Sequence, residues 1–266
     1  MIVAKTMGLR TVIATRYVTP LREGGSLPAI IEADDDGMYV LKFRGAGQGP
    51  KALVAELVAG EIARAVGLPV PEIVFVDLDA ELARTEPDPE IQALIRASVG
   101  LNLALDYLPG AVTFDPIAEK PNSELASSIV WFDAYVSNVD RTPRNSNILV
   151  WHRRLWLIDH GAALYFHHAW DDPLERSRDP FPHIKDHVLL PLAGSLQEIQ
   201  AKMLAGITRD VIESVFKLIP DSWLADDTSA GGSLERRNVY VEYLLRRLKP
   251  PQAFLEEAIR ARSLHL

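Results

Sequence analysis

The 266-residue sequence contains no cysteine and no run of about 18 apolar residues. Without cysteine there is no disulfide, no thiolate metal site and no cysteine nucleophile, and a reducing compartment is permitted. No basic N-terminal stretch leads into a long apolar segment, so neither a secretory signal nor a membrane-spanning helix is expected. The sequence therefore predicts a soluble, cytoplasmic protein with no membrane partner.

A surplus of basic residues is also missing. Lysine and arginine number 28 against 36 aspartates and glutamates, which gives a formal net charge of −8. A general nucleic-acid binder normally has a basic surplus or a strongly basic face, so nucleic acid is not an expected partner. The hydrophobic content of 48% is enough to bury a core, either as one two-lobed unit or as two modest domains.

The polar loop before residue 148 and the hairpin after it carry the clearest chemical signal. Two apolar runs, 148–151 and 155–158, predict paired strands joined by a turn, so the chain leaves the loop and returns to it at Asp159. Asp140 and Asn145 lie in that loop, and Asn147 ends it. The layout predicts that two carboxylates and an amide converge on one point.

Such a convergence suits phosphoryl transfer, which needs a carboxylate to orient the attacking hydroxyl and oxygen ligands to hold Mg²⁺. We predict that Asp140 orients the acceptor hydroxyl and that Asn145 and Asp159 bind Mg²⁺. Asn147 is either a supporting partner or an alternative ligand. Aspartate and asparagine are also ordinary turn and cap residues, so the signal depends on the combination and not on any one of them.

Together, Asp140-Arg141, Asn145 and Asp159-His160-Gly161 resemble the catalytic and metal-binding loops of the HipA-like kinases and, more distantly, of phosphoinositide kinases. The resemblance implies an α+β, two-lobed protein-kinase-like fold, ATP and Mg²⁺ as ligands, and serine or threonine hydroxyls on proteins as acceptors. Protein kinases carry phenylalanine where this chain has His160, so a packing switch set by that aromatic ring is not expected.

Lys42 lies in an apolar strand, and alternation places it on one face with Met38 and Val40. In kinases a strand lysine contacts the α- and β-phosphates, while an apolar residue two positions earlier covers the adenine. We therefore predict that Lys42 binds the phosphates and Val40 the adenine. The alternative is an exposed lysine that discourages edge pairing of the strand.

Glycine-rich turns flank this strand. Gly24, Gly25 and Ser26 precede it and can offer backbone N–H groups to phosphates, and whether Ser26 is itself phosphorylated is left open. The stretch 45–49 follows the strand and forms either a flexible cover or a link to the next helix.

A helix is predicted over residues 51–66, and a kinase needs a helical glutamate to hold the phosphate-binding lysine. By the resemblance this residue aligns with Glu56, followed by Gly-Leu-Pro-Val-Pro. Helical geometry instead places Glu61 inside the apolar face, so Glu61 remains the rival.

The strand ending at Leu108 precedes Pro109-Gly110, where we place the boundary between the lobes. Residues 1–109 would form the nucleotide-binding N-lobe, a small antiparallel sheet with one helix. Residues 110–266 would form a mainly helical C-lobe. By position, backbone groups of Asp106, Tyr107 and Leu108 would face the adenine edge, although a plain edge strand fits the residues equally well.

The sequence thus predicts an ATP-dependent phosphotransferase, a serine/threonine kinase by resemblance, and leaves two alternatives open. One is a nucleotide-binding pseudokinase that docks a partner. The other is a kinase for small molecules or lipid head groups, which a basic groove lined by Arg176, Arg178 and Lys185 would favour. The acceptor, any regulatory protein partner and the oligomeric state are not determined by these residues.

Overall fold

The structure of the chain is a computed structural model, and it describes residues 8–21, 27–84, 86–225 and 232–264. The predicted phosphate-loop residues Gly24, Gly25 and Ser26 lie outside the described residues. Across the described part, no helix is both long enough and apolar enough to cross a membrane.

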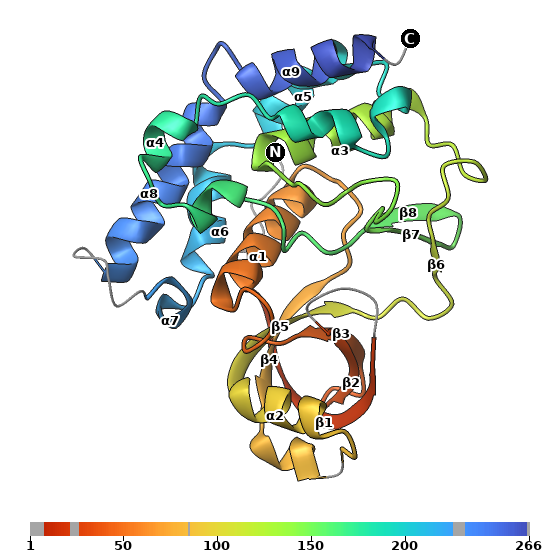
Figure 1. Cartoon of the computed structure of the whole chain (residues 1–266), viewed down its shortest axis with the longest axis vertical. Coiled ribbons are helices and arrows are strands. Elements are labelled where there is room, and N and C mark those ends of the chain that lie inside the picture. Colours follow the sequence, from red (N-terminus) through yellow and green to blue (C-terminus); the bar gives the residue numbers. More distant parts are fainter. Residues whose placement is uncertain (1–7, 22–26, 85, 226–231, 265–266) are drawn as a thin grey trace.

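The N-terminal part is a closed sheet of five strands, which forms the ring at the lower end of Figure 1. The strands follow the order β1-β2-β3-β5-β4, and β4 pairs back onto β1 to close the barrel. Their bounds are β1 Thr11–Pro20, β2 Ala29–Ala33, β3 Met38–Lys42, β4 Ile73–Leu78 and β5 Gly100–Asp106.

Closure corrects the prediction of a purely antiparallel sheet, because the β1–β4 pair is parallel. Strand β1 is ten residues long, and its register with β2 shifts between Ala14 and Arg16 and again between Tyr17 and Thr19. Such irregularities bend and twist a strand. The start of β1 can therefore pair with β4 while the rest pairs with β2.

The side chains of β3 alternate between the two faces of the barrel, as the sequence predicted. Tyr39 and Leu41 are buried in the interior, where Ile91 and Ile95 of α2 (Pro89–Ala97) pack beside them. A short 3-10 helix, η1 (Ala80–Arg84), leads into α2. Lys42 therefore points away from the barrel interior.

Helix α1 (Pro50–Ala65) joins the barrel to the helical part of the molecule. Every residue from Leu53 to Ala63 is buried, because the helix contacts β4 and β5 on one side and α6 and α7 on the other. A Cβ at Gly60 would lie 2.4 Å from the Ile73 side chain, so the missing side chain permits close approach to β4. Figure 1 shows α1 lying among the C-terminal helices.

The C-terminal part is mainly helical and is arranged around α3 (Ser123–Val136), which is continuously buried from Ala126 onward. Asn122 caps this helix, and its side-chain oxygen accepts the Leu125 N–H at 2.8 Å. The other helices are η2 Tyr165–His168, α4 Pro173–Arg176, η3 Pro182–Asp186, η4 Leu190–Leu192, α5 Leu196–Gly206, α6 Arg209–Lys217, α7 Asp221–Leu224, α8 Gly232–Arg247 and α9 Ala253–Ser263.

A second, three-stranded sheet lies between these two parts and consists of β6 (Val112–Thr113), β7 (Ile148–Trp151) and β8 (Arg154–Leu157). The pair β7–β8 is the hairpin expected from the sequence. Strand β5 belongs to the barrel and β6 to this second sheet, so the chain crosses between them around Pro109. The predicted lobe boundary lies in that crossing.

Candidate active site

Three ionic side chains from distant parts of the sequence meet where the barrel faces the hairpin. The Nζ atom of Lys42 on β3 lies 2.6 Å from Oδ1 of Asp159, which follows β8. The same Nζ lies 3.5 Å from Oε2 of Glu56 on α1. We call these three residues the Lys42 cluster. Glu56 is 1% exposed, whereas the Asp159 side chain is 38% exposed, so the cluster has one closed and one open side.

The electrostatics of this cluster favour the charged forms. Burial opposes the charge on Lys42, but the attraction of Glu56 and Asp159 outweighs it and raises the pKa of the lysine. Burial likewise opposes ionisation of Glu56, and the positive charge of Lys42 together with the neighbouring His160 outweighs it and lowers the pKa of Glu56. The buried lysine and glutamate are therefore an ion pair at neutral pH.

This geometry decides between the two candidate glutamates. Glu61 is also buried, but its carboxylate pairs with Arg64 on the same helix at 3.0 Å. Glu56 reaches Lys42 although helical periodicity placed it away from the apolar face. The periodicity argument failed because α1 is buried on all sides, so that no face of it is a solvent face.

His160 is fully buried behind the cluster, and its Nδ1 lies 3.5 Å from Oε1 of Glu56. Neither ring nitrogen has a hydrogen-bond partner among the residues described. Protein kinases have a phenylalanine at this position. Here the polar ring of His160 lies against the Glu56 carboxylate.

The second group of predicted residues lies in the loop before β7. The side-chain nitrogens of Asn145 and Asn147 both donate to Oδ2 of Asp140, at 2.7 and 3.2 Å. We call these three residues the Asp140 loop. Because each amide uses its nitrogen here, its carbonyl oxygen is the atom left for a cation. Both asparagines therefore remain possible ligands.

The Asp140 loop and the Lys42 cluster are joined through the backbone. The N–H of Ile158 donates to the Asn147 carbonyl at 3.0 Å, and the β7–β8 pairing holds Ile148 opposite Leu157. Asn147 and Asp159, at the two ends of the hairpin, both have positive φ, 47° and 54°. Asparagine and aspartate accept this conformation more readily than most residues, so they suit positions where the chain changes direction beside a site. No direct contact between Asn145 and Asp159 is found in the described part of the chain.

Four buried residues support the Asp140 loop through hydrogen bonds. Asp133 on α3 accepts from Asn138 Nδ2 at 3.0 Å, from Arg141 Nε at 2.5 Å and from His187 Nε2 at 2.9 Å. We call these residues the Asp133 network. Asn138 in turn accepts the backbone N–H of Asp140 at 3.2 Å. The network thereby fixes the backbone next to the candidate catalytic acid.

Hydrogen bonding defines the protonation of the Asp133 network. The Leu189 N–H donates to Nδ1 of His187, so the proton of a neutral ring lies on Nε2 and is donated to Asp133. Burial lowers the pKa of His187, which keeps the ring neutral. Burial disfavours the charge of Asp133, but Arg141 and His187 overcome this and lower its pKa.

Asp133 and His187 were not found from the sequence. Asp133 lies in an otherwise apolar stretch of α3, between Phe132 and Ala134, and an acid at such a position was the available signal. His187 had no local signal, since its partner is far away in the chain.

Two of the three backbone N–H groups in the predicted adenine-facing segment already donate to backbone carbonyls elsewhere in the barrel part. The N–H of Asp106 donates to the Glu72 carbonyl at 2.8 Å, and the N–H of Tyr107 donates to the Met38 carbonyl at 3.0 Å. Leu108 N–H has no partner among the described residues. Of the three predicted residues, Leu108 therefore has the donor that is left for a ligand.

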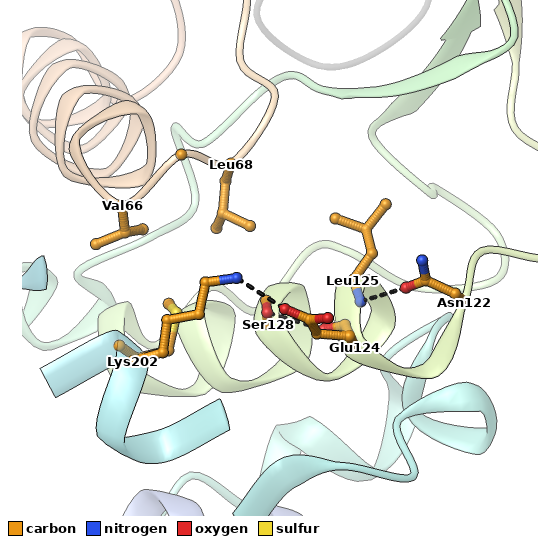
Figure 2. A pocket seen from close by; sticks show the side chains of 9 residues that line it. Val66, Leu68, Asn122, Glu124, Leu125, Ser128 and Lys202 are labelled. Atoms are coloured by element: carbon orange, nitrogen blue, oxygen red, sulfur yellow. Dashed lines mark hydrogen bonds and ion pairs between the residues drawn. The ribbon is translucent and has the colours of Figure 1, made fainter. Parts of the chain in front are cut away.

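A cavity of about 230 Å³ lies away from these residues, between the end of α1, the start of α3 and α5 (Figure 2). Leu68, Leu125 and Met203 line it, and the Lys202–Glu124 ion pair at 2.8 Å lies across one side. None of its lining residues belongs to the predicted site.

The donor set near Asp159 fits a hard divalent cation. It offers one partly exposed carboxylate and the amide oxygens of the Asp140 loop, and no group of three or more histidine, cysteine, aspartate or glutamate side chains able to hold a metal occurs in the described residues. Magnesium typically binds through one or two carboxylates and relies on substrate phosphates and water for its other ligands. The donor set is therefore compatible with a divalent cation that is carried with a phosphate.

A buried lysine–glutamate pair, an acid after a hairpin and an acid in a supported loop are the arrangement of a protein-kinase-like phosphotransferase. Residues 15–257 match a family model described as HipA-like kinase. The chain belongs to the HipA-like kinase family.

Among solved structures, the chain is similar to the Helicobacter pylori proinflammatory kinase CtkA, with 13% identity, a TM-score of 0.53, and coverage of 97% of this chain and 99% of that one. It also matches a Golgi casein kinase with Mn/ADP bound, with 11% identity, a TM-score of 0.49, and coverage of 92% and 75% of the two chains. The likeness to CtkA shows a shared protein-kinase-like fold. A comparison with curated protein sequences found no match.

Proposed function

We propose that this chain transfers the γ-phosphoryl group of Mg-ATP to a serine or threonine hydroxyl of a protein. The observation that carries the proposal is the meeting of Lys42, Glu56 and Asp159 beside the Asp140 loop. These side chains come from the barrel, from α1 and from both ends of the hairpin. Lys42 supplies the positive charge and Glu56 anchors it. Asp159 is the metal-binding acid and Asp140 the proton-accepting acid that phosphoryl transfer requires.

Each residue has a separate task in this proposal. Lys42 binds the α- and β-phosphates and is held by Glu56. Asp159 and Asn145 hold Mg²⁺, with Asn147 as the alternative, and the ion neutralises charge on the transferring phosphoryl group. Because both amides donate to Oδ2 of Asp140, Oδ1 is left to accept the proton of the attacking hydroxyl.

Nucleotide binding requires a rearrangement of the Lys42 cluster. In the structure the Lys42 ammonium group donates a hydrogen bond to Asp159. When Mg-ATP binds, Asp159 must release the lysine and bind the metal, while Lys42 moves to the phosphates. Glu56, buried at 3.5 Å, keeps the lysine nearby during this exchange. Val40 and the backbone of Asp106, Tyr107 and Leu108 would face the adenine.

The acceptor class rests on family membership. Arg176, one of the residues proposed for a basic groove, donates to the carbonyls of Phe166 and Ala169, and Arg178 lies 3.6 Å from Glu175. Arg176 is used within the segment, whereas Arg178 and Lys185 stay exposed. The preference for a protein hydroxyl therefore comes from family membership, and a cytoplasmic location stays a prediction.

Two alanine variants test the assignment. Asp140→Ala should lower ADP release from Mg-ATP by about 10²- to 10⁴-fold while the thermal shift with ADP and Mg²⁺ is kept, because this acid acts only on the proton. Asp159→Ala should lose both ADP release and the thermal shift with ADP and Mg²⁺, since it removes a metal ligand. Asp210→Ala changes an exposed acid in the first turn of α6 and should alter neither.

Full turnover in both active-site variants would refute the assignment. A wild type that shows the nucleotide-dependent shift but transfers no labelled phosphoryl group to itself, to water or to any protein of a cell extract would be a pseudokinase. Mass spectrometry after incubation with labelled ATP and a cell extract would then identify the acceptor of an active protein.

A further inference from the structure

The buried carboxylate of Glu56 contacts two different groups with its two oxygens. Oε2 lies 3.5 Å from Nζ of Lys42, and Oε1 lies 3.5 Å from Nδ1 of His160. Glu56 is 1% exposed and His160 is fully buried. A charged carboxylate in such a place is costly unless partners compensate it. Both contacts therefore bear on whether Glu56 stays ionised beside the lysine.

The turn that carries His160 is packed on the same carboxylate. The carbonyl of His160, which follows Asp159 directly, accepts the Ala163 N–H at 2.9 Å. A Cβ at Gly161 would lie 3.7 Å from Oε2 of Glu56 and 3.5 Å from Oδ1 of Asp159. The backbone at Gly161 therefore runs past both carboxylates, and the turn with the candidate metal-binding acid rests on the helix glutamate.

The ring of His160 has to be the donor in its contact with Glu56. An ionised carboxylate only accepts hydrogen bonds, so Nδ1 faces it favourably when that nitrogen carries a proton. Among the described residues Nδ1 has no nearer hydrogen-bond partner. Burial opposes the ionisation of Glu56, and the charge of Lys42, followed by the interaction with His160, outweighs it and lowers the pKa of Glu56. A phenylalanine at this position would offer the carboxylate no donor.

We propose that His160 is a positioning residue that acts through Glu56. Its Nδ1–H holds one carboxylate oxygen, so that the other stays directed at Lys42 while Asp159 releases the lysine and binds the metal. Both contacts of Glu56 are longer than ordinary hydrogen bonds, which leaves room for the carboxylate to close on its two partners during this exchange. The inference rests on the proposed function, because it concerns the phosphate-binding lysine of that same site.

The reason lies in the freedom of the glutamate side chain. A carboxylate fixed at one oxygen can no longer turn its other oxygen away from the lysine. Supporting hydrogen bonds of this kind hold a ligand-binding group in its productive geometry. Glu61 has no such support, since its carboxylate pairs with Arg64 on the same helix.

The first test compares two replacements of His160. His160→Phe keeps a flat ring of similar size without a donor, and it should lower kcat/KM for ADP release from Mg-ATP by about 10- to 100-fold. His160→Asn places an amide donor near the lost Nδ1 and should stay within about fivefold of wild type. A loss in His160→Asn as large as that in His160→Phe would show that the ring matters and not the donor, and would overturn the proposal.

A double-mutant cycle tests whether His160 acts through Glu56. Glu56→Gln removes the anionic partner of the ring. In that background His160→Phe should change kcat/KM by less than about twofold, because the carboxylate that it positioned is already gone. If the two losses instead multiply, the residues act independently and the proposal is wrong.

The matched control is His167→Phe. His167 is equally buried, but its Nδ1 lies 3.0 Å from the Tyr240 hydroxyl of α8, outside the Lys42 cluster. This variant should keep kcat/KM within about twofold of wild type. A loss equal to that of His160→Phe would attribute both effects to packing and overturn the proposal.

A measurement on the unaltered protein needs no catalysis. Nitrogen NMR of isotope-labelled wild type reports which ring nitrogen of each histidine carries a proton, and the His160 signals are identified by their loss in His160→Asn. Nδ1 of His160 should be protonated. A ring protonated only on Nε2 would overturn the proposal, even if His160→Phe fails to fold.

These outcomes are separable from a failure of the proposed function. If wild type transfers no phosphoryl group at all, the phosphotransferase assignment itself is wrong, and the NMR measurement still decides whether His160 donates to Glu56. If wild type is active and a folded His160→Phe keeps its full kcat/KM, only the present inference is wrong.

Discussion

Two ionic groups, the Lys42 cluster and the Asp133 network, both contact the ends of the same hairpin and are built differently. The Glu56 carboxylate approaches Lys42 and the His160 ring only at 3.5 Å. The Asp133 carboxylate accepts three hydrogen bonds of 3.0 Å or less. The first arrangement can change when a ligand arrives. In the second the carboxylate already has close partners, although Nη2 of the buried Arg141 has none among the described residues.

The difference follows from what each group must do. A lysine that will move to a phosphate cannot be held by a full set of hydrogen bonds. A loop that aims a carboxylate at a hydroxyl works best when its support does not move. Longer contacts therefore mark the ligand-binding group, and short hydrogen bonds to one carboxylate mark the supporting group.

The largest effect is expected from breaking the support. Asp133→Asn leaves Arg141 buried without its counter-charge, and removing one partner of a buried pair costs about 3–5 kcal/mol. Urea unfolding should show this loss as a lower midpoint. Glu56→Gln, in the looser cluster, should cost clearly less, and equal losses would remove the distinction between the two groups.

A second, smaller effect separates the two helix glutamates in activity. Glu56→Gln should lower kcat/KM for ADP release by about 100-fold, because Lys42 loses the anchor that positions it. Glu61→Gln disrupts only a pair with Arg64 on the same helix and should leave the rate unchanged. The reverse order of losses would make Glu61 the partner of the phosphate-binding lysine.

The smallest expected effect is in the pH dependence of stability. Burial lowers the pKa of His187 in the folded protein, so below about pH 6.5 the unfolded chain binds a proton that the folded chain does not. The free energy of unfolding therefore falls as the pH falls from 6.5, by up to about 1.4 kcal/mol per pH unit for this group. His187→Leu should reduce that slope.

Glu56→Gln is the matched comparison in the other cluster. The pKa of Glu56 is lowered from its ordinary 4.5, so its stabilisation is complete above pH 4.5 and is lost only as the pH falls through its folded value. Between pH 6.5 and 4.5 this variant should keep the wild-type slope. Chemical denaturation measured at several pH values checks both expectations.

Local patterns in the sequence predicted the elements that carry the site. The alternation along β3 placed Lys42 on one face with Met38 and Val40, and the apolar runs around residues 148–158 predicted the hairpin that returns the chain to the loop at Asp159. These features depend on neighbours within a few residues, which is why one sequence was enough.

Other features depended on partners far along the chain and were missed. The parallel β1–β4 pair and the burial of α1 on all sides had no local signature. Helix α2 was missed although Asp88 caps it and Pro89 opens it. The burial of α1 also explains why helical periodicity kept Glu61 as the rival of Glu56, because periodicity assumes a solvent face.

The sequence by itself determined which chemistry is present: the two acids at 140 and 159, the amides between them, and a lysine on a strand. Only the tertiary structure decided which of two glutamates meets that lysine, and that an acid on α3 and a histidine beyond η3 complete the loop's support. The physical reason is distance along the chain. Hydrogen bonds and ion pairs between remote residues are set by how whole elements pack, and no local pattern records that packing.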